Sequence, residues 1–116
     1  MIDIDYQKAL DFEHIENINE ARNKLSQLTT LLNRVLIIRQ NSKKEILESC
    51  SKYKGERLEK LSWDNKLLKL AELSGSSELV NLWQEADSAY RQIRHKHSQV
   101  MEDLLVLKKQ IDFIPR

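Results

Sequence analysis

The chain has 116 residues, of which 41% are hydrophobic and 32% charged, and its formal net charge is +1. This composition is typical of a folded helical protein rather than a disordered chain, and the balanced charge gives no bias toward nucleic acid, anionic membranes or acidic substrates. Two glycines and one proline argue against a many-stranded sheet, and a single cysteine, Cys50, excludes an intrachain disulfide.

The N-terminal ten residues alternate only weakly between apolar and polar side chains. We expect residues 1–10 to form a flexible arm, or an arm docked on a single domain that covers residues 1–116. Asp11 is the expected N-cap of a first helix at residues 12–40, because its carboxylate can accept bonds from free backbone N–H groups. That helix carries an apolar stripe at three-four spacing, made by Ile15 or Ile18, Ala21, Leu25, Leu28, Leu32 and Val35.

The apolar pattern lapses over seven polar residues from Arg39 to Glu45. Within them, residues 42–45 have the S-x-x-E form of a capping box, which predicts a turn near Asn41 and a second helix at 43–73. A break at Gly55 is the alternative, since lysine followed by glycine resembles a helix C-terminus. The turn at Asn41 gives three helices of similar length, which favours it and leaves Gly55 as a kink or second break. The second helix is then expected to bury Ile46, Leu47, Cys50, Leu58, Leu61, Leu67 and Leu68.

A third helix is predicted at 77–112, after Gly75 as the residue that ends the second helix and Ser76 or Ser77 as the N-cap. It carries a heptad seam typical of a coiled coil, made by Leu79, Trp83, Ala86, Tyr90, Ile93, His97, Val100, Leu104, Leu107 and Ile111. The fold class is therefore an all-α, antiparallel up-down-up bundle of three long helices.

His97 is the one polar side chain on this seam. Counting residues through a turn at Gly75 places it near Tyr53, and a turn at Asn41 places Tyr53 opposite Thr29 and Thr30. We interpret His97 and Tyr53 as a polar layer in the core that sets the register of the helices.

No motif in the chain indicates catalysis. His95 and His97 point to different faces of a helix, unlike the i, i+4 pair of a zinc helix, and no second cysteine supplies a thiolate. Nucleophilic, metal and phosphate-binding chemistry lack their usual residues, so we expect no enzyme, no cofactor and no small-molecule substrate.

We therefore predict an α-helical protein-protein interaction module: an adaptor, an assembly factor or a chaperone-like bundle that can self-associate or bind a partner helix in a groove. The expected contact is the far end of the third helix, at Leu104, Leu107, Ile111 and Phe113. The alternative is a nucleic-acid-associated helical protein that uses the basic residues between Arg22 and Lys66, although acids interleaved with these bases argue against it.

The stretch from Leu73 to Trp83, followed by one long helix, resembles the C-terminal half of small flagellar export chaperones. The resemblance covers about a third of the chain, and it implies a helical protein that binds apolar C-terminal helices of its clients. Where that family often has asparagines, this chain has Arg94, His95 and His97. No stretch resembles a signal peptide or a membrane span, so we expect a cytoplasmic protein.

Overall fold

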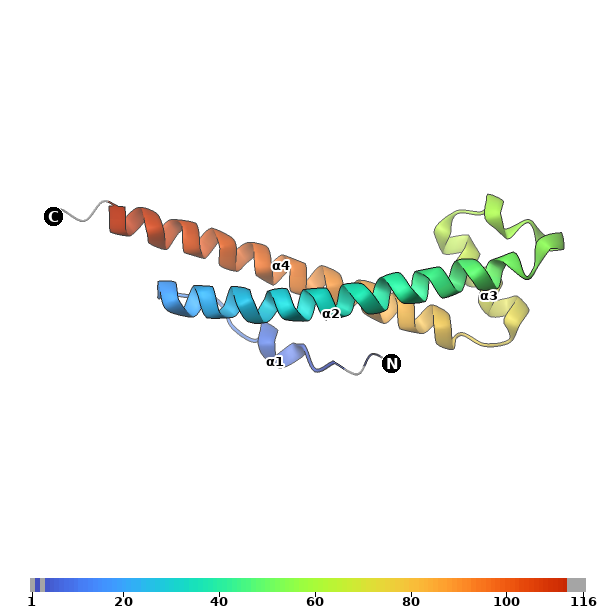
Figure 1. The fold of residues 1–116 in the computed structure, drawn as a ribbon, viewed down its shortest axis with the longest axis horizontal. Coiled ribbons are helices and arrows are strands. Elements are labelled where there is room, and N and C mark those ends of the chain that lie inside the picture. Colours follow the sequence, from blue (N-terminus) through green and yellow to red (C-terminus); the bar gives the residue numbers. More distant parts are fainter. Residues whose placement is uncertain (1, 3, 113–116) are drawn as a thin grey trace. The chain divides into compact units, whose positions relative to one another are not determined.

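The computed structural model describes Ile2 and residues 4–112, and all regular structure in this part of the chain is helical (Figure 1). The elements are α1 (Gln7–Leu10), α2 (Ile18–Ser51), the 3-10 turns η1 (Lys54–Glu56) and η2 (Leu58–Lys60), α3 (Trp63–Ser74) and α4 (Glu78–Asp112). The predicted all-α class, with α2, α3 and α4 as the main helices, is confirmed.

The described residues group into two compact units. Unit 1 contains Ile2 and residues 36–87, and unit 2 contains residues 4–35 and 88–112. Because α2 and α4 run through both groups of residues, each unit has its own section of the α2–α4 pair.

The last helix begins and ends close to the predicted bounds of 77–112. Gly75 ends α3 in the left-handed conformation at φ 70°, which costs glycine nothing, and its N–H donates to the carbonyl of Ala71. The hydroxyl of Ser76 accepts a hydrogen bond from the backbone N–H of Glu78 at 3.3 Å, which satisfies one free donor at the start of α4.

The predicted turn at Asn41 is wrong, and with it the bounds 12–40 and 43–73, because α2 continues through this residue to Ser51. The break comes instead next to the alternative position, Gly55, where η1 and η2 separate α2 from α3 and Arg57 adopts a left-handed conformation. Ser42 does not cap a helix. Its side chain is buried and its hydroxyl donates to the carbonyl of Arg39 within α2 at 3.0 Å.

The start of the first long helix also differs from the prediction. Asp11 follows the four-residue helix α1, and α2 begins only at Ile18. The N-cap is Asn17, whose side-chain oxygen accepts from the backbone N–H groups of Asn19 at 2.8 Å and Glu20 at 3.2 Å.

Unit 1 is organised around one apolar cluster contributed by α2, η2, α3 and α4. Trp63 and Trp83 pack against this cluster. Their two rings meet edge to face, with ring centroids 5.1 Å apart. Leu47 and Leu68, which we expected to be buried, are exposed instead, because the single helix at 43–73 on which that expectation rested is interrupted by η1 and η2. The buried members of the cluster are Ile46, Cys50, Leu58, Leu67, Leu70 and Val80.

Unit 2 is built on an α2–α4 pair whose facing positions follow both predicted stripes. The contact from Thr29 to His97 and the pocket shared by Ile18 and Ile111 show that the two sections run antiparallel. The buried side chains are Ala21, Leu28, Leu31 and Val35 from α2, Ala89, Ile93, Val100 and Leu104 from α4, and Ala9 and Ile15 from the segment before α2.

Candidate partner-binding site

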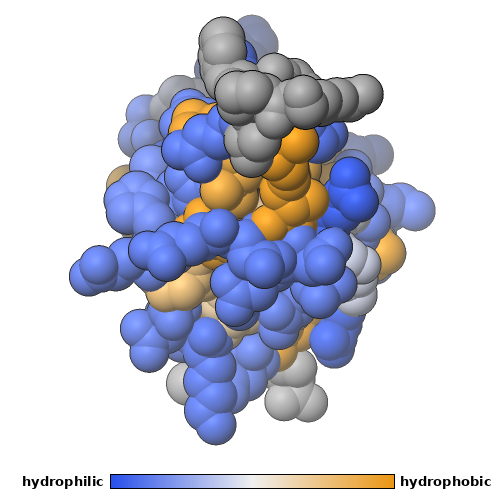
Figure 2. Space-filling view, turned by 90° about the vertical axis from the view of Figure 1, so that its left-hand side faces the viewer, coloured by the Kyte–Doolittle hydropathy of each residue, from blue (hydrophilic) through white to orange (hydrophobic). Residues whose placement is uncertain are grey.

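The end of α4 that we expected to bind a partner is partly covered and partly exposed. Leu104 is buried in the α2–α4 pair, Leu107 is half-buried and Ile111 is 54% exposed, while Phe113 lies outside the described residues. Leu107, Ile111 and Ile18 line a pocket of about 400 Å³ together with polar side chains of both helices. Figure 2 looks onto this end of unit 2 and shows hydrophobic side chains gathered among hydrophilic ones.

One side of the α2–α4 pair in unit 2 is covered by the segment before α2, which we call the arm (residues 4–17). Lys96 donates to the carbonyl of Phe12, and its ammonium lies 4.7 Å from the centre of the Phe12 ring. The ammonium of Lys24 in α2 lies 5.0 Å from the centre of the same ring. The Phe12 ring is therefore within cation–π distance of one lysine from each long helix.

Farther along the arm, three more contacts hold it on α4. Gln99 donates to the carbonyl of Glu13, and the carboxylate of Asp103 accepts from the backbone N–H of Ile15 at 3.4 Å. The other oxygen of Asp103 lies 3.5 Å from Nδ1 of His14. These contacts align the arm with the side of α4 that presents residues 96, 99 and 103.

The opposite side of the pair, which we call the open side, has no such cover among the described residues. Around Val100 of the seam, Met101 and Leu105 lie on the side away from Lys96 and Asp103, because adjacent residues are about 100° apart on a helix. Met101 is 44% and Leu105 55% exposed. From α2, Leu25 and Leu32 lie on this side beside Thr29, and both are half-buried. The open side thus presents these four apolar side chains around the polar contact of Thr29 with His97.

Our prediction for the partner-binding residues missed Met101 and Leu105. They are one helical turn apart and lie next to the seam positions His97, Val100 and Leu104, so the sequence does contain a widened apolar face at this point. The arm covers the other side of the helix pair and so leaves this face exposed, but the residues that hold the arm follow no comparable pattern in the sequence.

The two residues predicted to form a polar layer lie in different units. In unit 2, Nε2 of His97 lies 3.3 Å from the hydroxyl of Thr29. In unit 1, Tyr53 follows the end of α2 and packs against the apolar cluster around Ile46 and Cys50. The prediction paired them by counting through a turn at Gly75 along one continuous second helix at 43–73, and that count does not apply because η1 and η2 separate α2 from α3.

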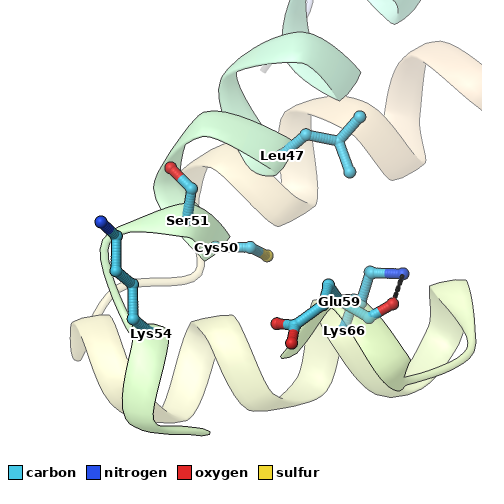
Figure 3. A pocket seen from close by; sticks show the side chains of 6 residues that line it. All are labelled: Leu47, Cys50, Ser51, Lys54, Glu59 and Lys66. Atoms are coloured by element: carbon cyan, nitrogen blue, oxygen red, sulfur yellow. Dashed lines mark hydrogen bonds between the residues drawn. The ribbon is translucent and has the colours of Figure 1, made fainter. Parts of the chain in front are cut away.

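Unit 1 has a pocket of its own, of about 440 Å³, between the end of α2 and the η2–α3 segment (Figure 3). Burial raises the pKa of the Cys50 thiol, and the nearby charge of Lys66 lowers it in part. Lys66 donates to the backbone carbonyls of Leu61 at 2.9 Å and Glu59 at 3.5 Å. A protonated thiol and a lysine engaged with the backbone form no nucleophile–base pair, so this pocket does not indicate catalysis.

Within Ile2 and residues 4–112, no group of three or more histidine, cysteine, aspartate or glutamate side chains is placed to hold a metal ion. None of the described helices combines the length and hydrophobicity that crossing a membrane requires.

Comparison of the chain with protein-family models, with curated proteins and with solved structures finds no match in any of the three.

Proposed function

We propose that this chain is a non-enzymatic α-helical protein-interaction module, an adaptor or assembly factor, that binds a partner protein through the open side of unit 2. The observation that carries the proposal is the exposure of Met101 and Leu105 directly beside the seam. Large aliphatic side chains in a row along a helix pair are typical of surfaces that receive another helix.

The arrangement of the arm supports the same proposal. A pair of helices has two grooves, one along each side, and in unit 2 the arm occupies one of them through Phe12 and Ile15. The other groove has half-buried Leu25 and Leu32 at its base and exposed Met101 and Leu105 at its edge. A third helix laid there would bury all four side chains, as in a helix-in-groove complex. We place this function in the cytoplasm, where a lone buried thiol such as Cys50 stays reduced.

The test compares partner capture by three tagged forms of the full chain in the cells that produce it: the unmodified chain, Leu105→Glu and Val106→Glu. Val106 is a matched control, because it is 54% exposed and lies about 100° around α4 from Leu105 and about 140° from Met101. Bound proteins are identified by mass spectrometry, and untagged copies of the chain itself are counted among them.

We expect at least one protein to be captured by the unmodified chain and by Val106→Glu but not by Leu105→Glu. The proposal is contradicted if no protein depends on Leu105. It is equally contradicted if the retained material is nucleic acid that is released by salt, since counterion release governs that kind of binding.

A further inference from the structure

We infer that the partner of the open side is a second copy of this chain, bound through an antiparallel, two-fold contact between the α4 helices centred at Leu105. The inference rests on the proposed function and names its partner. It is carried by the charges that flank the exposed apolar side chains.

Leu105 has an acidic residue about one helical turn before it and a basic residue about one turn after it. Glu102 precedes it by three residues and Lys109 follows it by four, and both side chains are exposed. On a helix these two residues lie about 40° to 60° to the same side of Leu105, one turn below it and one turn above it. They form the same edge of the surface around Leu105.

Within the chain these two charges are too far apart to pair, because they are two helical turns, or about 10 Å, from each other. The ion pairs found among Ile2 and residues 4–112 engage neither of them. Both charges are therefore available to a partner.

A two-fold axis through the contact reverses the direction of the second α4 helix. Residues on the same edge of the two helices then face each other, as e–e′ and g–g′ positions do in antiparallel coiled coils. Glu102 of each copy faces Lys109 of the other, and the two Leu105 side chains meet at the centre. One contact thus forms two opposite-charge pairs, as the self-complementary surface of a two-fold dimer requires.

The apolar side chains fit the same arrangement. Met101 lies on the inner edge, toward the groove that contains Leu25, and the antiparallel partner presents the aliphatic stem of Lys108 at that level. The contact would cover Met101 and Leu105 in both copies and extend each pair of helices into a four-helix arrangement.

The experiment is sedimentation velocity of the full chain over a range of concentrations, with circular dichroism to establish that each variant is folded. The unmodified chain should show a concentration-dependent increase from monomer to dimer. Leu105→Glu should remain monomeric up to about 0.2 mM, a concentration far above the Kd of a dimer of micromolar affinity, whereas the matched control Val106→Glu should dimerise like the unmodified chain.

The charge pairs allow a sharper test. Glu102→Lys and Lys109→Glu should each weaken the dimer about tenfold, because either change replaces two attractions by two repulsions. The double variant Glu102→Lys/Lys109→Glu exchanges the charges and should restore the affinity to within about threefold of the unmodified chain. A Leu105→Cys chain should also form a disulfide-linked dimer on oxidation faster than Val106→Cys does, Cys50 being present and buried in both.

Two results would overturn the inference. One is a chain that stays monomeric at every concentration, and the other is a dimer that survives Leu105→Glu or is not restored by the double charge exchange. If the chain is monomeric but a different protein is captured in a Leu105-dependent manner, the second copy is ruled out and the proposed function stands. If neither association depends on Leu105, both fail.

Discussion

Nε of Arg39 in α2 lies 2.9 Å from a carboxylate oxygen of Asp87 in α4, and both belong to unit 1. The guanidinium also lies 5.9 Å from the ring centre of Trp83, one turn before Asp87 on the same helix. The polar stretch that begins at Arg39 thus has a partner across the helix pair. This explains why α2 continues where the apolar stripe stops.

Removing either charge should destabilise unit 1, and the two losses should differ. The side chain of Asp87 is 12% exposed and that of Arg39 34%, so the carboxylate depends more on its protein partner than the guanidinium does. We expect Arg39→Ala to lower the free energy of unfolding by about 2 kcal/mol and Asp87→Ala by about 1 kcal/mol. Urea denaturation measures both, and Arg34→Ala, an exposed position on the same helix, should stay within about 0.5 kcal/mol. Equal effects of Arg39→Ala and Arg34→Ala would contradict the role of the pair.

Substitutions at Asn41 and Ser42 test the continuity of α2. Asn41→Pro should cost about 3 kcal/mol or more, because proline in a helix interior removes a hydrogen bond and clashes with the carbonyl four residues earlier. Asn41→Ala at the same exposed site serves as control. Ser42→Ala should leave stability within about 0.5 kcal/mol of the unmodified chain, whereas loss of an N-cap would cost about 1 kcal/mol. A well-tolerated proline at Asn41 would indicate that α2 turns there after all.

The two glycines should respond in opposite directions to alanine. A Cβ added at Gly55 meets no atom within 4 Å, and Gly55 does not have a positive φ. Gly55→Ala should therefore be neutral or stabilising by up to about 1 kcal/mol, through the lower entropy of the unfolded chain. Gly75 has the same open surroundings but φ +70°, so Gly75→Ala should destabilise by about 1 kcal/mol. Thermal unfolding of the two variants gives the comparison, and equal shifts would count against the left-handed end of α3.

Because of Cys50, the stability of the folded chain should fall at alkaline pH. Burial raises the pKa of its thiol in the folded state, so the folded chain holds this proton more tightly than the unfolded chain. The resulting stabilisation is present below the unfolded pKa of about 8.5 and is lost as the pH rises through the folded pKa. Between pH 7.5 and 10, the free energy of unfolding measured in urea should fall more in the unmodified chain than in Cys50→Ala.

The same thiol can be followed by labelling. At pH 8 a thiol reagent should modify Cys50 at least about tenfold faster in denaturing urea than in buffer, because the thiolate fraction and the access both increase on unfolding. Equal rates in the two conditions would show that Cys50 is not buried.

Several elements of this fold follow from the sequence alone. The three-four spacing along α4 and along the first half of α2 predicts both helices and their facing residues, because a helix brings residues three and four apart to one face whatever surrounds it. The chemistry of Gly75 and the serines after it likewise marks the end of α3 and the start of α4. For the candidate site, the sequence predicts an apolar seam along α4 up to Ile111 but does not single out Met101 and Leu105 at the edge of the open side.

What only the tertiary structure decided are the features that depend on distant partners. A polar run from Arg39 to Glu45 is a turn in one context and the middle of a helix in another, and Asp87, 48 residues away, decides between them. In unit 2, the arm covers one groove of the helix pair through contacts more than 80 residues apart in the chain, such as that of Lys96 with Phe12. Local spacing specifies which face of a helix is apolar. Which of its edges stays open depends on where the rest of the chain packs.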